Sequence, residues 1–340
     1  MRTPSVRDLY WILKGPGLLN PEHPAFADRL LRDDWFQEKA REGEEWFRRC
    51  DENPAALLED LKSRENQTML LGRYFEALLS FWIREYLKPE AFYGGVPVQE
   101  HEPSKPGQGR NTVGEFDFVF KLPGHGALPS QIYHWEAAVK FYLFAGETPD
   151  QALKMNHYFG TLHRDRLDIK VAKIFHHQLK LSERLDGESV LAYLGLPSPQ
   201  PLAWIKGMLF YPAQSSCQNS WKNHVHPLEV SPHHQKGWWT EIHQLDVPVE
   251  NRDDRWVILP KHRWLSPAMV QPQKGDEQRL FTLDEMKAHC QAHFAEHLSP
   301  LMWAEVSWNE SMKAWNEVNR GLVVYSGWLG KALESLAGSS

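Results

Sequence analysis

The sequence has few cysteines, no long hydrophobic run and no excess of basic residues. Its three cysteines among 340 residues, Cys50, Cys217 and Cys290, are far apart and have no metal-binding spacing. Isolated cysteines in odd number argue against a disulfide framework, and free thiols in a reducing cytosol are the simplest interpretation. No apolar stretch approaches the roughly 20 residues that a membrane-spanning helix needs, and residues 1–20 contain no secretory hydrophobic region. We therefore expect a cytoplasmic protein.

Acidic residues outnumber basic ones, with 44 Asp and Glu against 38 Lys and Arg, which gives a formal net charge of −6. A chain of this charge has no global positive field, so any contact with nucleic acid must depend on local basic patches. No phosphate-binding loop (G-x-x-x-x-G-K-[ST]) and no nucleophile motif (G-x-S-x-G) is present. P-loop NTPases and serine hydrolases of the common type therefore have no support.

The clearest pattern lies between residues 111 and 144, where two strands are predicted on either side of a Pro/Gly-rich loop. The strands span residues 113–121 and 131–144. Side chains alternate between the two faces of a strand. In the first strand, this alternation predicts that Phe116, Phe118 and Phe120 share one face and that Asp117 lies on the other.

The second strand follows the same period and places His134, Glu136 and Lys140 on one face. If the two strands are neighbours, Asp117 projects from that same face. Two carboxylates and an ammonium group are costly to bury on an apolar sheet unless they pair or bind a ligand. The alternatives to a functional site are a structural ion pair between Glu136 and Lys140 and a hydrogen-bonded histidine at position 134.

Two predicted helices can bring further polar side chains to this sheet. One helix spans residues 66–87 and carries Glu76. The other, from about residue 164 to 185, has an apolar seam of Leu167, Val171, Ile174, Leu181 and Leu185, on which Gln178 is the one polar residue. A second stripe on this helix is basic and includes Arg166, Lys170 and Lys173. It is either a solvated helix face or a track for nucleic-acid phosphates.

These residue types are suited to phosphodiester hydrolysis. That reaction needs a divalent cation to activate water and to neutralise charge on the phosphate. Mg²⁺ is held by only one or two carboxylates, with water and phosphate oxygens completing its shell. Asp117 and Glu136 supply such carboxylates, and Lys140 supplies a cation that can stabilise the transition state.

The motif GEFDF and the following strand HWEAAVKFYL resemble the PD-(D/E)XK nuclease superfamily over about residues 67–212. The resemblance implies a restriction-endonuclease-like core, DNA as the partner, and Mg²⁺ or Mn²⁺ as the cofactor. It implies that Asp117 and Glu136 bind metal and that Lys140 is the catalytic cation. Glu76 would be an accessory metal ligand, and Gln178 would orient water or the lysine. With its later GWW, the whole chain is also similar to a bacterial family of unknown function grouped with these nucleases.

One position departs from the superfamily pattern. The acid normally lies two residues before the lysine, where this chain has Ala138. Glu136 lies on the same face one pleat repeat earlier, roughly 7 Å along the strand. Either the acid has moved and reaches the same ion, or the site is degenerate and the protein binds nucleic acid without cutting it.

The order of elements over residues 67–212 indicates an α/β (α+β) class, with a central mixed sheet flanked by helices. We expect a helical segment over 1–66, the core over 67–212 and a mixed region over 213–340.

The mixed region has a helix predicted over 281–297 with Thr282 as its N-cap. Its tryptophans either pack in the core, stack on bases or form a protein-interaction scaffold: Trp221, Trp238, Trp239, Trp256 and Trp264. Its histidines lack zinc-site spacing: His224, His226, His233, His234 and His243.

Overall fold

The computed structural model describes residues 1–26, 28–64, 70–100, 111–124, 129–213, 220–245, 253–272 and 279–338. The chain forms two compact units: unit 1 comprises Met1–Val139 and Ile169–Lys206, and unit 2 comprises Lys140–Asp168 and Gly207–Ser340. The expected division into 1–66, 67–212 and 213–340 follows chain order, whereas each unit combines two separate segments; the three-part division stays a prediction. The expected α/β (α+β) class, a mixed sheet with flanking helices, is confirmed.

The sheet of unit 1 has the strand order β1-β2-β3-β5. These strands are β1 (Ala91–Gln99), β2 (Thr112–Leu122), β3 (Gln131–Phe144) and β5 (Gln200–Pro212). β2 pairs antiparallel with both β1 and β3. The strands predicted over 113–121 and 131–144 are therefore confirmed. The last residues of β3 and β5 belong to unit 2.

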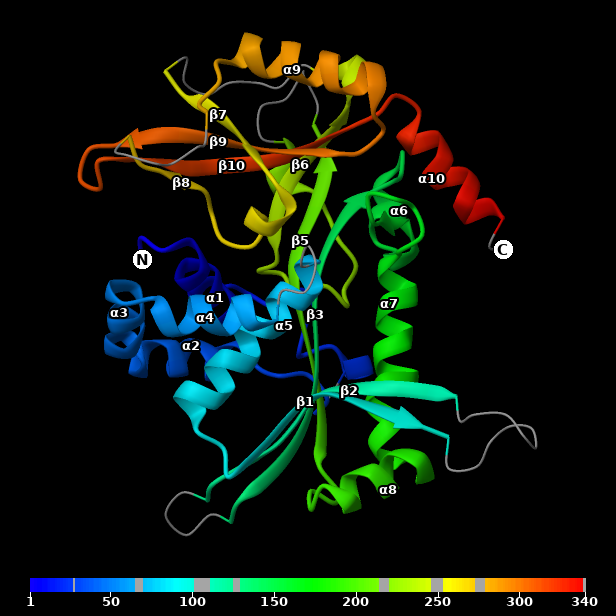
Figure 1. Ribbon diagram of the computed structural model, residues 1–340. Coiled ribbons are helices and arrows are strands. Elements are labelled where there is room, and N and C mark those ends of the chain that lie inside the picture. Colours follow the sequence, from blue (N-terminus) through cyan, green and yellow to red (C-terminus); the bar gives the residue numbers. More distant parts are fainter. Residues whose placement is uncertain are drawn as a thin grey trace. The chain divides into compact units, whose positions relative to one another are not determined.

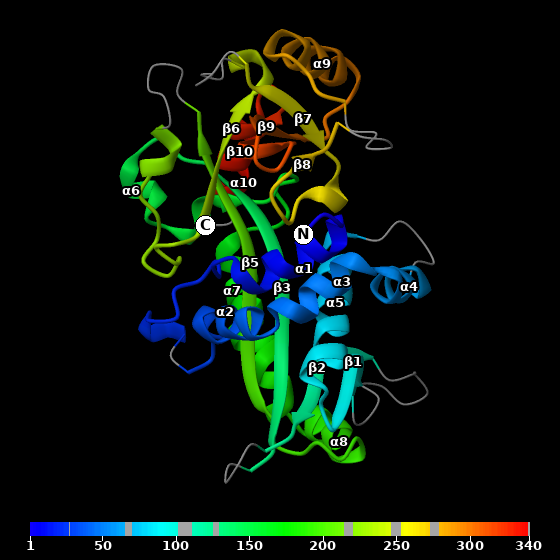
Figure 2. The same cartoon turned by 90° about the vertical axis from the view of Figure 1, so that its left-hand side faces the viewer.

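Helices cover both faces of the unit 1 sheet. The helices on one side are α1 (Pro4–Lys14), α2 (Asp33–Glu42), α3 (Glu44–Glu52), α4 (Ala55–Ser63) and α5 (Leu71–Trp82). Figures 1 and 2 show them together on one side of β3 and β5, with α7 (Leu167–Lys173) on the other side. Aromatic packing fills the first interface: Phe36 of α2 stacks on Trp204 of β5 at 3.6 Å between ring centroids and meets Trp135 of β3 edge-on.

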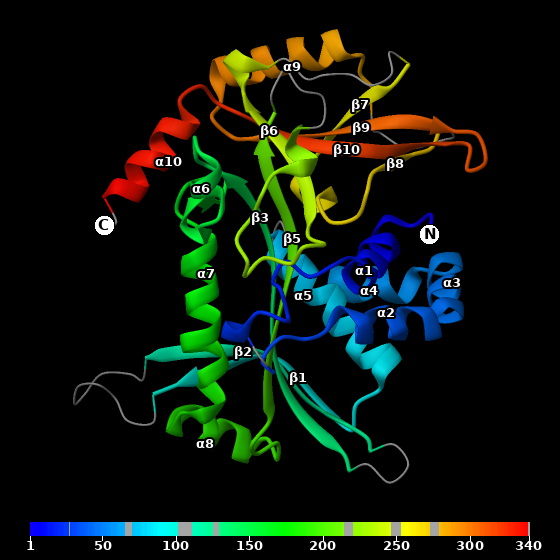
Figure 3. The same cartoon turned by 180° about the vertical axis from the view of Figure 1, so that it is seen from behind.

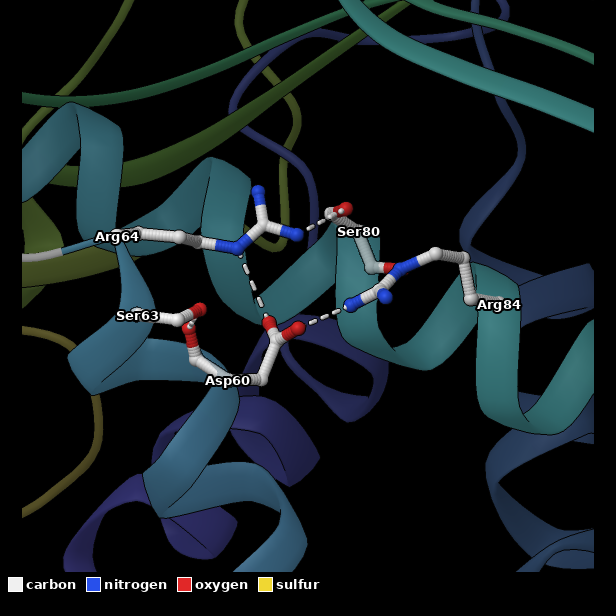
Figure 4. A network of polar contacts seen from close by, with 5 residues as sticks. All are labelled: Asp60, Ser63, Arg64, Ser80 and Arg84. Atoms are coloured by element: carbon white, nitrogen blue, oxygen red, sulfur yellow. Dashed lines mark hydrogen bonds and ion pairs between the residues drawn. The ribbon is translucent and has the colours of Figure 1, made fainter.

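The position of α5 is fixed by a polar network with α4 (Figure 4). The Asp60 carboxylate of α4 accepts hydrogen bonds from Arg64 at 3.1 Å and from Arg84 at 2.5 Å. Arg64 also donates to the hydroxyl of Ser80, which is buried in α5. Because α5 carries Glu76, this network anchors the helix that brings Glu76 to the sheet. Residues 65–69, at the start of the helix expected from 66, lie outside the described residues.

The three phenylalanines of β2 were expected to share one face of the strand, and this expectation is wrong for Phe116. Phe120 packs against Trp135, as expected, and contacts Phe92 beside Phe118. Phe116 instead belongs to the core cluster on the opposite face, with Val119 and Leu181. The regular alternation of β2 is therefore interrupted between Phe116 and Phe118, which is where Asp117 lies.

The long helix expected from about residue 164 to 185 is a succession of shorter pieces. After α7 come a π turn (Ile174–Gln178), a 3₁₀ turn (Leu179–Glu183) and α8 (Leu185–Tyr193). Leu167, Val171, Ile174 and Leu181 are buried as predicted, but Leu185 is 65% exposed, so its place on the seam is wrong. The turns explain this result, because they rotate the chain away from a regular helical period. In Figure 3, α8 lies beside the β1–β2 ribbon, against which it packs through Leu191.

Unit 2 has a sheet in the order β3-β5-β6-β10-β9-β7, with β4 beside β3 and β8 beside β10. Its remaining strands are β4 (Tyr158–Phe159), β6 (Gln235–Glu241), β7 (Arg255–Leu259), β8 (Met269–Val270), β9 (Leu301–Asn309) and β10 (Ala314–Val324). Its helices are α6 (Pro149–Ala152), α9 (Leu283–Glu296) and α10 (Trp328–Ala337). The predicted cap at Thr282 is confirmed, since its side chain and Glu285 form a capping box at the start of α9. In the described part of the chain, no helix has the length and apolar character to cross a membrane.

The tryptophans singled out in the C-terminal region are core residues. All five are buried: Trp221, Trp238, Trp239, Trp256 and Trp264. Base stacking needs exposed rings, so these side chains do not form a stacking surface, and the core interpretation is confirmed. Cys290 is a buried free thiol and Cys50 is a free thiol that is half-buried, whereas Cys217 lies outside the described residues.

Candidate functional site

The site begins where the hydrogen-bonded pairing of β2 and β3 ends. Their register runs from Leu122–Gln131 to Phe118–Trp135. Beyond this pair, the backbone N–H of Ala137, two residues further along β3, donates to Oδ2 of Asp117, the next residue of β2, at 2.9 Å. The Asp117 carboxylate thus takes the place of a backbone acceptor and is held at the point where the ladder stops.

Glu136 lies next to this point and is almost fully buried, with 1% of its surface exposed. Each of its two oxygens has its own partner. Oε1 lies 2.8 Å from Nε2 of His134, and Oε2 accepts a hydrogen bond of 2.6 Å from Nε2 of Gln178. The prediction that Gln178 turns from its seam towards the strand is supported by this contact. A buried carboxyl with both oxygens hydrogen-bonded has a fixed orientation.

Asp117, Glu136 and Glu76 act on one another electrostatically. Burial, and then the neighbouring Glu136 carboxyl, raise the pKa of Asp117 to about 7. Burial raises the pKa of Glu136 to about 8, and the two carboxyl groups are within hydrogen-bonding reach of each other. Burial, and then the charge of Asp117, raise the pKa of Glu76 to about 7. Three acids that resist ionisation at one place indicate a shortage of positive charge there.

Two cations partly offset this shortage. Arg73 contacts Glu76 at 3.0 Å and Glu115 at 3.2 Å, and its own side chain is 61% exposed. Glu115 is therefore salt-bridged to Arg73. The second cation is Lys170, whose charge lowers the pKa of both Asp117 and Glu136.

Lys170 reaches the site from α7 through Gln178. Its Nζ lies 3.4 Å from Oε1 of Gln178, so the amide bridges the lysine and Glu136. Residues eight apart on a regular α-helix point about 80° apart. The π turn at Ile174–Gln178 adds a residue to the turn and brings the two side chains towards the same side. No sequence period reveals this pair, which is why Lys170 was expected only on the basic stripe.

The other predicted cations are either paired with aspartates or exposed. Lys140 belongs to unit 2, where its amine pairs with Asp165 at 2.5 Å, and the Tyr142 hydroxyl donates to the same carboxylate. Arg166 is also in unit 2 and is bound through two nitrogens to Asp168. Lys173 is exposed on α7. Three basic residues were proposed as a phosphate track. Arg166 is paired with Asp168 and Lys170 contacts Gln178, whereas Lys173 is exposed and takes part in none of the contacts described above.

The donor set can be tested against a divalent cation. Within the described ranges, no group of three or more His, Cys, Asp or Glu side chains is arranged so that it could hold a metal ion. Mg²⁺, however, usually takes one or two carboxylates and completes its shell with water and phosphate. The carboxylate oxygens of Asp117 and Glu136 fit that requirement. Ala138 supplies no further acid on β3, so the pair would be the only carboxylate ligands from these two strands. The histidines of the C-terminal region give no zinc site among the described residues.

Comparison with known proteins gives a family and nothing more specific. A family model described as a domain of unknown function (DUF1853) matches residues 7–324, which is most of the chain. No curated protein and no solved structure matches the sequence or the fold.

Proposed function

The chain belongs to the family described as a domain of unknown function (DUF1853), and for it we propose a metal-dependent nuclease that hydrolyses phosphodiester bonds, with DNA as the first substrate to test. The observation that carries the proposal is the pair formed by the half-buried Asp117 carboxyl and the buried Glu136 carboxyl, whose pKa values are raised to about 7 and 8. Carboxylate oxygens that have few positive charges near them are suited to binding Mg²⁺ or Mn²⁺. The position of the pair on adjacent strands agrees with the resemblance of GEFDF and HWEAAVKFYL to the PD-(D/E)XK nucleases.

A divalent cation at this pair would supply an activated water and neutralise charge on the phosphate. The residues of the chain prepare the pair for it. The Ala137 N–H orients Asp117, while His134 and Gln178 orient Glu136. Binding of the cation would favour the ionised forms of both carboxyls and would therefore release protons from the pair.

The contacts favour Lys170 over Lys140 as the cation that stabilises charge in the transition state. Lys170 is joined to Glu136 through Gln178 and acts on both carboxyls of the pair. Lys140 is occupied by Asp165. Glu76 would remain an accessory ligand, because its carboxylate is shared with Arg73. Lys173 is the candidate for contact with a substrate phosphate.

Two observations favour a second candidate, a nucleic-acid-binding protein without catalytic activity. Ala138 stands where the superfamily has an acid, and the described residues offer no three-ligand group. Such a protein would bind nucleic acid without metal, and its affinity would fall steeply with added salt.

The test is hydrolysis of single- and double-stranded DNA and RNA with Mg²⁺, with Mn²⁺ and with chelator. We expect cleavage by the wild type that needs the cation and falls at least about a hundredfold in Asp117→Asn, the scale of losing one electrostatic group from an active site. Lys170→Met should lose far more activity than Lys140→Met. The matched control is Lys173→Met on the same helix, which should weaken substrate binding and leave the maximal rate unchanged.

The outcomes separate the two candidates. Equal cleavage by the wild type and Asp117→Asn would mean that this pair is not the active site. Salt-sensitive binding with no cleavage under any cation would favour the binding protein instead.

A further inference from the structure

We propose that His134 is the positioning residue that fixes the Glu136 carboxylate for cation binding, an inference that rests on the proposed function. Nothing in the motif resemblance assigns a role to this position. His134 has none of its surface exposed and therefore cannot touch a substrate itself. Its effect can only pass through the groups that it contacts.

The imidazole ring is held from three directions. Its Nε2 lies 2.8 Å from Oε1 of Glu136, and its Nδ1 lies 3.4 Å from the hydroxyl of Ser182. The ring of Phe116 meets it edge-on at 4.7 Å. That contact depends on the interrupted alternation of β2, which turns Phe116 to the His134 side of the sheet. The histidine is thus immobilised before any ligand arrives.

This arrangement does not form a nucleophilic serine triad, although Ser182, His134 and Glu136 follow one another. The Ser182 hydroxyl donates its proton to the carbonyl of Leu179 at 3.2 Å. It is also buried. Ser182 therefore holds the imidazole through Nδ1, the ring nitrogen that does not face Glu136.

These contacts fix the direction of the lone pairs of Glu136 that accept no hydrogen bond from His134 or Gln178. With Oε1 held by His134 and Oε2 by Gln178, the carboxylate cannot rotate without breaking a buried hydrogen bond. Its remaining acceptor capacity is directed towards Asp117, with which it can share an ion. Histidines and carboxylates that orient metal ligands in this way typically contribute ten- to a hundredfold to metal affinity.

The experiment measures Mn²⁺ binding to the full-length chain by calorimetry. His134→Leu removes the polar contact to Glu136, whereas His134→Gln keeps an amide that can hydrogen-bond to it. We expect the leucine variant to bind Mn²⁺ at least about tenfold more weakly than the wild type and the glutamine variant to stay within about threefold. Asp117→Asn, which removes a ligand, should abolish binding.

A matched control separates positioning from a general loss of packing. His157 is another buried histidine, bonded through Nδ1 to the carbonyl of Ala145 in unit 2. His157→Leu should destabilise the chain without changing its Mn²⁺ affinity. Unchanged affinity in His134→Leu would overturn the proposal for His134 while leaving the nuclease proposal standing.

A wild type that binds no Mn²⁺ would overturn the metal-dependent function. His134 is then judged by crystal structures of the wild type and His134→Leu. Positioning predicts that the Glu136 carboxylate turns away from Gln178 in the variant. An unmoved Glu136 would refute it.

Discussion

The acidic pair predicts that folding stability falls as pH rises, and that Glu136→Gln removes part of this dependence. Burial raises the pKa of Glu136 from 4.5 to about 8. Below about pH 4.5 the carboxyl is protonated in both the folded and the unfolded chain, so this group costs no stability. Between about pH 4.5 and 8 only the unfolded chain releases the proton, and each pH unit lowers the free energy of unfolding by about 1.4 kcal/mol.

The full effect of this one group by pH 8 is of the order of 4–5 kcal/mol, since the pKa rises by about 3.5 units. Asp117 acts in the same direction, because its pKa also rises, to about 7. Glutamine at position 136 keeps the shape of the side chain and carries no charge at any pH. Its oxygen can accept from Gln178 while its amino group donates to His134. Glu136→Gln should therefore be more stable than the wild type near pH 8 and similar to it near pH 4.5.

The assay is urea unfolding in chelator across this pH range, followed by tryptophan fluorescence and far-UV circular dichroism. The wild-type free energy of unfolding should decline with a slope that Glu136→Gln reduces by about 1.4 kcal/mol per pH unit. Glu45→Gln is the control, because Glu45 is an exposed acid of the same unit. Parallel pH profiles for the wild type and Glu136→Gln would refute the claim that Glu136 retains its proton in the folded chain.

Two further predictions concern single lysines. Lys206 is fully buried in unit 1 and bonds to Asp33 and to the carbonyl of Gly15. Lys206→Met should therefore lower the free energy of unfolding, measured in urea, by about 3–5 kcal/mol. A loss below about 1 kcal/mol would contradict the importance of this ion pair. Lys173 is exposed, so Lys173→Glu should weaken DNA binding and reduce its dependence on salt in fluorescence anisotropy, and unchanged binding would remove Lys173 from the nucleic-acid surface.

Local sequence patterns were sufficient to predict the strands and most of the polar cluster. The alternation in β3 correctly placed Glu136 beside His134, because both side chains lie on one face of an unbroken strand. Gln178 was identified as the one polar residue on an apolar seam, and it contacts Glu136. The capping box at Thr282 was readable because its contacts span only three residues.

The features that failed are those set by contacts distant in sequence. Perfect alternation placed Phe116 with Phe120, but the β2–β3 ladder stops at Phe118 and Asp117 bonds to the backbone of β3 instead. A regular helical period places Leu185 on the seam, although a π turn and a 3₁₀ turn intervene. The helical segment over 164–185 contains no proline or glycine that would mark its interruption, whereas β2 has Gly114 two residues before Phe116. Propensity and period describe regular elements, whereas tertiary packing decides where they are interrupted.

The π turn at Ile174–Gln178 has a consequence for how such proteins diverge. A π turn arises when one residue is inserted into an α-helix, and its deletion restores the regular helix. Deletion would rotate every later side chain by about 100°, the angle per residue of an α-helix. Gln178 would then leave Glu136, and Lys170 would lose its link to the carboxyl pair. A single-codon deletion in this segment would disconnect the lysine without changing any residue of the strands that carry Asp117 and Glu136. A gap of one residue at this position in a related chain would therefore distinguish proteins that keep the connected lysine from those that have lost it.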